Sequence, residues 1–147
     1  MRGVHKLYKS EFGAFIIRVV LGSIFLLHGL AKFQEGIGET VKRFESYNIP
    51  YAGYASFGVA GIELLGGFFL IIGFSVRFVS ALMIIIMTVA IATVKFDEGF
   101  LNGYEYNVAL LAMSSYLMFA GSRLLALDKL FVADPKKKSK IEFRRSY

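Results

Sequence analysis

Long apolar runs separated by short polar connections dominate the sequence. Four of these runs are each about long enough to cross a bilayer as an α-helix, namely residues 14–33, 54–74, 76–94 and 106–127. They lack the strict alternation of barrel strands, and a helix satisfies its backbone polar groups within its own segment, as lipid requires. The pattern therefore predicts an all-α fold, a bundle of four transmembrane helices.

The connection between the first two runs has a helical pattern of its own. Within GIGETVKRFESYNIP (residues 36–50), Ile37, Val41 and Phe44 recur at helical spacing, while charged residues occupy the other sides. This predicts a short amphipathic helix that lies at the membrane interface and is stopped by Pro50. A solvated loop is the alternative.

Composition agrees with a membrane location and excludes several kinds of chemistry. The chain has 147 residues, of which 56% are hydrophobic, more than in an ordinary soluble domain. It has no cysteine, which excludes disulfides, iron–sulfur clusters, thiol relays and cysteine-ligated zinc. Because no phosphate-binding loop, nucleic-acid motif or repeat is evident, we expect the lipid bilayer and no nucleic acid as partners.

The distribution of positive charge predicts the orientation. The net charge is +6, and 12 basic residues lie on the side of the two termini and Arg77, against four on the other side. The positive-inside rule then places both termini in the cytoplasm of a multi-pass protein. We divide the chain into a basic N-terminal segment (1–13), a membrane domain (14–128) and a basic tail (129–147), which either acts as an orientation signal or binds anionic lipid or a partner. No signal-peptide cleavage site ends the first run, so it is expected to remain as a span.

Charged residues inside the predicted spans are the strongest indication of function. Glu63 lies near the middle of the second run, where a carboxylate has to be protonated or paired. His28, on the first run, is expected within about 4 to 5 Å of the same depth. The two side chains would be able to touch if both face the interior.

Helical spacing gives each run one face that carries its polar residues. On the first run this face holds Arg18, Gly22, Phe25, Gly29 and Lys32, with His28 at its edge. On the second it holds Glu63, Gly66 and Gly67; on the third, Arg77, Ala81, Ile84, Thr88 and Lys95; on the fourth, Glu105, Ala109, Ala112, Tyr116 and Arg123. These faces are predicted to point into the bundle, although charges at span ends can instead reach the headgroups.

Together these positions predict a hydrogen-bonding pocket for a planar amphiphile with carbonyl or hydroxyl groups. Its candidate ligand-binding or proton-active residues are His28, Glu63, Lys32, Glu105, Arg18, Thr88 and Tyr116. Bis-histidine haem ligation within one chain is excluded, because His5 lies on the opposite side. His28, Glu63 and Glu105 provide too few ligands for a metal, so no metal is predicted.

Three stretches resemble the signature regions of the DoxX family of four-helix membrane proteins. They are RVVLGSIFLLHGLAKF, GIELLGGFFLIIGFSVR and YEYNVALLAMSSYLMFAGSRLLALD. Where the family often has proline or glycine after its closing glycine, this chain has Ser122. The positions that match the family pattern are Arg18, Gly22, His28, Gly29, Lys32, Glu63, Gly66, Gly67, Gly73, Arg77, Glu105, Gly121, Arg123 and Asp128.

The resemblance implies a link to quinone redox chemistry and stress response. Family members include a thiosulfate:quinone oxidoreductase subunit in archaea, a partner of thiol and superoxide detoxification in mycobacteria, and oxidoreductase-like proteins needed for catechol tolerance in bacilli, which look closest in size. Distant eukaryotic relatives are cargo receptors or assembly chaperones, so the fold alone does not guarantee redox chemistry.

Two hypotheses follow. In the first, the protein is a redox subunit of a bacterial or archaeal plasma membrane that binds a quinone but no covalent cofactor. His28 and Glu63 would handle protons, and Lys32, Arg18 and Glu105 would position charge. Without cysteine or a haem pair, electrons would have to enter through a partner protein or the substrate. In the second, the same residues lock the packing of a scaffold, chaperone or transporter-like protein. Both leave homo-oligomerisation open.

Overall fold

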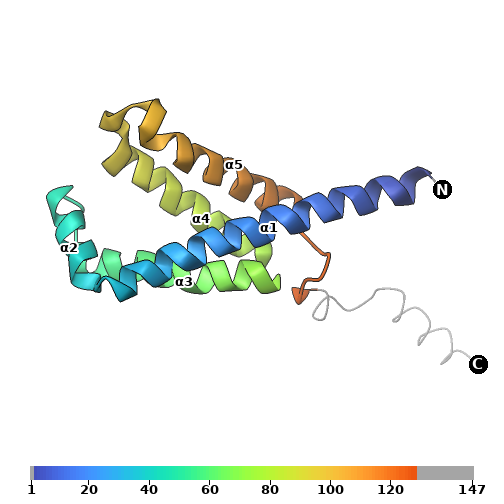
Figure 1. Ribbon diagram of the computed structural model, residues 1–147, viewed down its shortest axis with the longest axis horizontal. Helices are drawn as coiled ribbons and strands as arrows, with labels where there is room; N and C mark the ends of the chain where they lie inside the picture. Colours follow the sequence, from blue (N-terminus) through green and yellow to red (C-terminus); the bar gives the residue numbers. More distant parts are fainter. Residues whose placement is uncertain (1, 129–147) are drawn as a thin grey trace, which may run out of the picture.

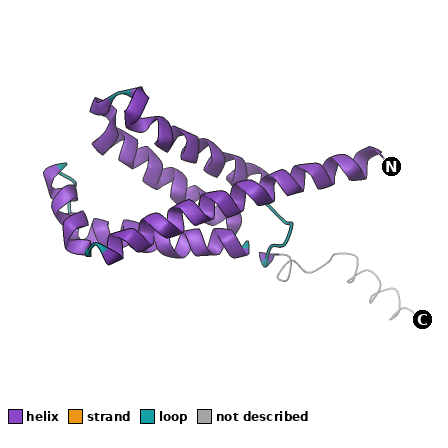
Figure 2. Ribbon diagram, viewed as in Figure 1, coloured by secondary structure: helices purple, strands orange, loops and turns teal. Residues whose placement is uncertain are grey.

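The computed structural model describes residues 2–128, with side chains from Ser10 onward. Within this range there are five α-helices: α1 (Arg2–Gln34), α2 (Ile37–Ser46), α3 (Ala52–Ile72), α4 (Val76–Ala90) and α5 (Glu105–Ala120). Three short helical segments connect α4 to α5: η1 (Ile91–Lys95), η2 (Phe96–Glu98) and η3 (Phe100–Tyr104). The described residues are almost entirely helical and contain no strand (Figure 2), which confirms the all-α prediction. The predicted tail, 129–147, lies outside the described residues, whereas residues 2–13 are the first turns of α1.

The helices form two antiparallel pairs, α1 with α3 and α4 with α5 (Figure 1). The pairs come together where α3 turns into α4, and they diverge toward the opposite end (Figure 1). We call the first end, made of the turn 73–75 and residues 121–128, the closed end. The other end, where α2 and the segments η1–η3 lie, is called the open end.

Three helical stretches are long and apolar enough to cross a membrane. They are Ser10–Gln34, Ala52–Ile72 and the continuous stretch Val76–Glu98, and they coincide with the first three predicted runs. The fourth predicted run, 106–127, extends too far, because the helix ends at Ala120, before Gly121 with its φ of 71°. With 16 residues, α5 is about 24 Å long, against a hydrocarbon core of about 30 Å, so a fourth span stays a prediction.

Glycines allow α1 and α3 to pack with their backbones in close contact. A Cβ atom added at Gly22 would lie 2.8 Å from the carbonyl oxygen of Gly67, and one added at Gly67 would lie 2.7 Å from that of Gly22. Gly29 meets the backbone of Leu64 in the same way. This close approach brings the polar face of α1 against α3, as small residues do between membrane helices.

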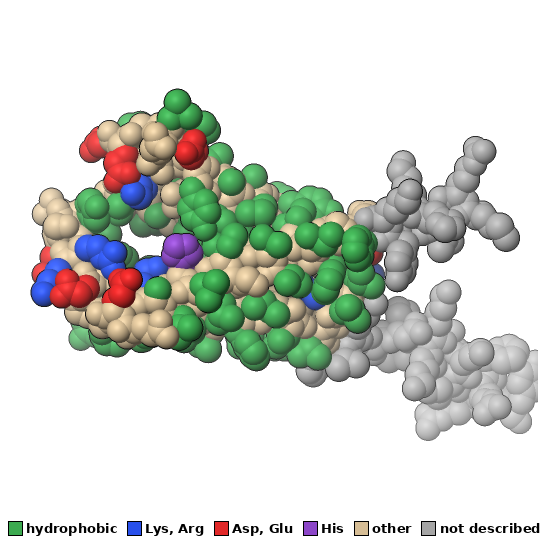
Figure 3. Space-filling view, viewed as in Figure 1, with side chains coloured by type: hydrophobic (Ala, Val, Ile, Leu, Met, Phe, Trp, Pro, Cys, Tyr) green, Lys and Arg blue, Asp and Glu red, His purple; other side chains and the backbone are tan. Residues whose placement is uncertain are grey.

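A small apolar core fills the space between the two pairs. Its buried members come from all four long helices: Leu21, Phe25, Leu70, Val76, Val79, Met83, Met87, Leu110 and Leu117. Many large apolar side chains point outward instead, and hydrophobic side chains cover much of the surface seen in Figure 3. A surface of this kind is suited to lipid rather than to water.

Polar residues tie the closed end together. The carboxylate of Asp128 accepts hydrogen bonds from the backbone N–H groups of Ser75 (2.7 Å) and Val76 (3.2 Å), which open α4. The backbone N–H of Asp128 donates to the carbonyl of Gly73, the last turn of α3. Residues 121–128 therefore satisfy the free ends of both helices of the turn.

Two arginines and a glutamate bind the segment around residues 121–128 from the other side. The fully buried Arg18 donates to the carbonyl (3.3 Å) and hydroxyl (3.4 Å) of Ser122 and to the carbonyl of Leu125 (3.0 Å). Glu11 accepts from the backbone N–H groups of Arg123 and Leu124. Arg77 donates to the carbonyl of Phe119, just before the bend at Gly121. The family-motif residues at this end thus have structural partners.

The predicted amphipathic helix is present as α2. Ile37, Val41 and Phe44 are half-buried on its inner face, where Thr40 is fully buried, and the charged residues point outward. The helix ends four residues before Pro50, because Asn48 adopts a positive φ of 53° and the N–H of Ile49 bonds back to Phe44. The predicted stop at Pro50 is therefore wrong, and a left-handed residue ends the helix instead.

Candidate functional site

A partly buried ion pair joins two of the candidate residues from the sequence. Nζ of Lys32, in the last turns of α1, donates to Oε2 of Glu63, in the middle of α3. The side chain of Glu63 is 6% exposed and that of Lys32 20% exposed. The partner expected for Glu63 was His28, whereas the ion pair is made with Lys32, whose long side chain reaches inward from the end of its span.

His28 faces a residue of α5 across the gap between the helix pairs. Its Nε2 lies 3.4 Å from the phenolic oxygen of Tyr106, and the two ring centroids are 6.2 Å apart. Either atom can donate the hydrogen bond, depending on the histidine tautomer. The first helix of one pair thus contacts the last helix of the other through this hydrogen-bonding contact.

Both pairs of residues line one cavity of about 660 Å³ at the open end. Its size falls within the range of small-molecule sites, about 300–1,000 Å³. The hollow is visible in Figure 3 beside the histidine, with basic and acidic side chains around it. We call it the polar cavity; its polar lining residues are His28, Lys32, Thr40, Arg43, Tyr47, Glu63, Thr93, Lys95, Tyr106 and Asn107.

Two of these polar residues are not fully satisfied by the protein. Thr40 is 2% exposed, and its hydroxyl has no hydrogen-bond partner among the described residues. The amide nitrogen of Asn107 has a sulfur, that of Met87 at 3.4 Å, as its acceptor. Because sulfur is a weak acceptor, Asn107 keeps most of its hydrogen-bonding capacity for a ligand.

The rim of the cavity carries basic residues that are already paired. Arg43 on α2 forms an ion pair with Glu35 at 3.3 Å, and Lys95 at the end of η1 pairs with Glu98 at 2.7 Å. Deeper in, the walls are apolar and include Phe25, Ile86 and Leu110. The cavity therefore combines an apolar interior with a few directed donors and acceptors, which suits a planar molecule with oxygen groups.

The structure brings three of the seven candidate residues into this cavity, His28, Lys32 and Glu63. Arg18 is bonded to the closed end, away from the cavity. The hydroxyl of Thr88 donates to the carbonyl of Ile84 in its own helix, at 2.8 Å. The remaining two, Glu105 and Tyr116, also lie outside the lining.

The predicted interior face is confirmed on α1 and wrong on α4 and α5. On α1, Arg18, Gly22, Phe25 and Gly29 are buried, as expected. On α4 the buried residues are instead Val76, Val79, Ser80, Met83 and Met87, and on α5 they are Leu110, Ser114 and Leu117. The charges of α4 and α5 lie at the helix ends, where they reach the surface, so they do not mark the inner face.

Glu105 serves the start of α5. Its Oε1 accepts a hydrogen bond from the backbone N–H of Asn102, at 3.2 Å, in a turn where Asn102 has a φ of 63°. Among the described residues no three histidine, aspartate or glutamate side chains lie close enough to hold a metal.

Sequence reasoning missed Thr40, Asn107 and Tyr106 as parts of the cavity. Thr40 was considered only as part of the connecting helix, and Tyr106 only as the first residue of the fourth apolar run. Asn107 gave a usable signal, since an amide inside an apolar run needs a hydrogen-bonding partner.

Comparisons with known proteins place the chain in a family. The family model described as DoxX matches residues 13–96, which include α1 from Gly13 onward, all of α2 to α4, and the Lys32–Glu63 ion pair. A protein of Bacillus subtilis (strain 168) named "Putative oxidoreductase CatD" is 38% identical over 131 residues, covering 89% of this chain and 95% of that protein. No solved structure matches the chain. Since the family model matches more than half of the chain and the Bacillus protein is 38% identical over most of both chains, this protein belongs to the DoxX family.

Proposed function

We propose that this protein is a membrane-embedded redox subunit that binds a quinone or a related phenolic compound in the polar cavity. The observation that carries the proposal is the partly buried Lys32–Glu63 ion pair, which lies in the same cavity as the His28–Tyr106 contact. Polar groups at this depth are costly unless they have a use, and here they converge on one hollow. The name of the Bacillus relative supports the redox class.

The lining matches the two forms of a quinone. Carbonyl oxygens of the oxidised form accept hydrogen bonds, which Lys32, Tyr106 and Asn107 can donate. Hydroxyl groups of the reduced form donate, and Glu63 and a neutral His28 can accept. The cavity thus offers complementary groups to both forms, and a bound molecule would contact α1 and α3 on one side and α5 on the other.

The proton inventory of the cavity fits a two-electron conversion. Reducing a quinone to a hydroquinone takes two electrons and two protons. His28 with Tyr106, and Lys32 with Glu63, are two sites where a proton can be held next to a ligand oxygen. The two electrons would come from a redox partner protein, because a chain without cysteine has no thiol or iron–sulfur carrier.

We further propose that α5 is a fourth span. It runs antiparallel to α4, packs along it, and exposes apolar side chains such as Val108 and Phe119. The chain bends before and after α5, so α5 lies alongside the other three spans. With the positive-inside rule, the closed end faces the cytoplasm of a bacterium or archaeon, and the polar cavity lies in the outer half of the plasma membrane.

The experiment compares two tyrosines that differ in position. Purified protein in lipid nanodiscs is titrated with menadione, and binding is followed by the rise in the thermal unfolding midpoint. Tyr106→Phe, inside the cavity, should weaken binding by roughly tenfold, since a directed hydrogen bond is lost. Tyr116→Phe is the matched control outside the cavity and should bind as the wild type does. No binding by the wild type, or equal effects of the two substitutions, would refute the proposal.

A further inference from the structure

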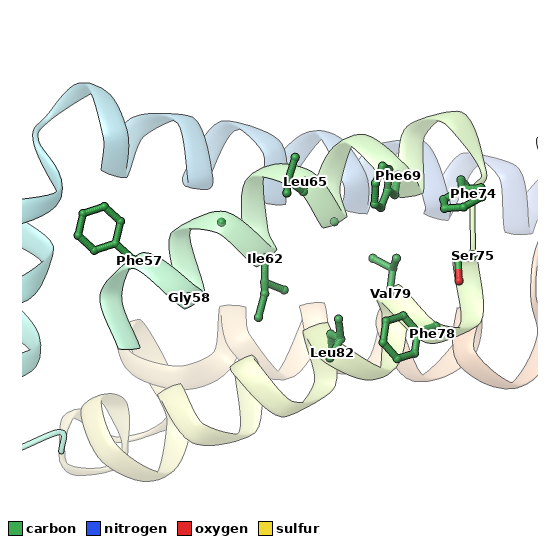
Figure 4. A pocket seen from close by; sticks show the side chains of 12 residues that line it. Phe57, Gly58, Ile62, Leu65, Phe69, Phe74, Ser75, Phe78, Val79 and Leu82 are labelled. Atoms are coloured by element: carbon green, nitrogen blue, oxygen red, sulfur yellow. The ribbon is translucent and has the colours of Figure 1, made fainter. Parts of the chain in front are cut away.

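A second hollow lies on the outer face of the molecule between α3 and α4 (Figure 4). It encloses about 540 Å³, and its lining contains no charged residue. Leu65 and Phe69 of α3 border it on one side, and Phe78 and Leu82 of α4 on the other (Figure 4). We call it the apolar groove.

The apolar groove adjoins the polar cavity. Gly58 and Ile62 line both hollows, so the two share a wall only one helical turn long. Figure 4 shows the side chain of Ile62 directed from α3 toward α4, between the ends of the groove. Gly58 has no atom within 4 Å of where its Cβ would lie, so the surface of α3 is open at this point.

Glycines on α3 also leave the groove open, because they have no side chains that would fill it. Gly61 lines the groove but not the polar cavity, and it too has no atom within 4 Å of a Cβ position. The glycines at 58 and 61 therefore leave a smooth strip on α3 that leads toward the cavity. A flexible hydrocarbon chain fits such a strip because it needs contact area and no hydrogen bonds.

We propose that the apolar groove receives the hydrocarbon tail of a ligand whose polar head occupies the polar cavity. The ligand class is then a quinone or phenol with an isoprenoid or alkyl tail, which enters sideways from the bilayer between α3 and α4. This inference rests on the proposed function. An entry of this kind keeps the tail in apolar surroundings throughout, whereas entry from water would expose every methylene group.

The continuity of the two hollows favours this occupant over a lone lipid chain. A lipid acyl chain would fill the apolar groove wherever it lay on the surface, and its position would bear no relation to the cavity. Here the groove shares two lining residues, Gly58 and Ile62, with the polar head site. One molecule with a polar and an apolar part therefore accounts for both hollows.

The experiment uses two quinones with the same head group. Menadione has no tail, and phylloquinone carries a long phytyl tail on the same naphthoquinone. Gly61→Leu fills the groove without touching the polar cavity, and Gly53→Leu is the matched control, a glycine of α3 with open space that lines neither hollow. Binding of each quinone to each variant in nanodiscs is measured by the shift in unfolding midpoint.

We expect Gly61→Leu to weaken phylloquinone binding by roughly tenfold or more and to leave menadione binding unchanged, because it obstructs only the tail. Gly53→Leu should leave both unchanged. Unchanged phylloquinone binding in Gly61→Leu would overturn the inference and assign the groove to lipid. An equal loss of binding for both quinones would also overturn it. If menadione binds in either case, the proposed function survives; if neither quinone binds the wild type, both proposals fail.

Discussion

Lys32 of α1 and Glu63 of α3 form an ion pair inside the protein, next to a cavity that opens between two diverging helix pairs. The pair depends on the glycine contacts between α1 and α3, which hold the two backbones close enough for the side chains to meet. It also polarises one wall of the cavity, because a cation and an anion lie there side by side. The interface between α1 and α3 therefore provides both the helix packing and the charged wall of the cavity.

Breaking this pair from one side should cost more than removing both partners. Lys32→Met leaves the carboxylate of Glu63 buried without its cation, and we expect a loss of about 3 kcal/mol in the free energy of unfolding. The double variant Lys32→Met with Glu63→Gln should recover most of that loss. Unfolding in mixed micelles is measured for the wild type, Lys32→Met, Glu63→Gln and the double variant. Additive effects of the two substitutions would show that the pair is not coupled.

Alanine at two glycines should change stability in opposite directions. Gly22→Ala places a methyl group 2.8 Å from the Gly67 carbonyl, so we expect a loss of about 1–3 kcal/mol. Gly61→Ala meets open space within a helix, so it should stabilise the protein by about 0.5–1 kcal/mol. The same unfolding assay checks both, and a shift of equal sign at the two sites would contradict the observed packing of α1 on α3.

The closed end makes its own prediction through Asp128. Asp128→Ala removes the acceptor for two N–H groups at the start of α4, and we expect a loss of about 1–2 kcal/mol. Asp97→Ala, in the exposed η2 segment, is the control and should have little effect. Equal lowering of the unfolding midpoint by the two substitutions would contradict this prediction.

Arg18 should matter for stability and not for ligand binding. The guanidinium of Arg18 makes three hydrogen bonds to Ser122 and Leu125, which a lysine side chain cannot reproduce. Arg18→Lys should therefore lower the free energy of unfolding by about 2–3 kcal/mol. The folded fraction should still bind menadione with wild-type affinity, as measured by titration in nanodiscs below the unfolding temperature. Weakened binding by stable, folded Arg18→Lys would return this residue to the candidate site.

The sequence predicted α1 and its inner face well, because the residues there carry information about packing. Glycines and an arginine repeat at helical spacing in the middle of an apolar run, and only the protein interior accommodates such a stripe. The same logic failed on α4 and α5, since their charged residues are terminal and free to reach the surface. There the interior is marked by Ser80 and Ser114, which are buried but too common in membrane helices to indicate a face.

The residues that line the cavity were harder to predict than the helices. Glu63 was found because a carboxylate in mid-span needs a partner, but its partner was misjudged, since the length of the lysine side chain lets Lys32 bond inward from the span end. Asn107 and Thr40 line the cavity because the two helix pairs diverge at the open end and leave a hollow that α5 and α2 also border. That depends on the angle between helix pairs, which no local sequence pattern specifies.

The most direct test of the central claim is the identity of the small molecules that co-purify with the protein. Wild type and the Lys32→Met, Glu63→Gln double variant are extracted gently from the membrane, and their bound compounds are measured by mass spectrometry. The account predicts a quinone or a related phenolic compound with the wild type, in an amount comparable to the protein, and its loss from the folded double variant. Equal amounts in both preparations, or no such compound in either, would contradict it.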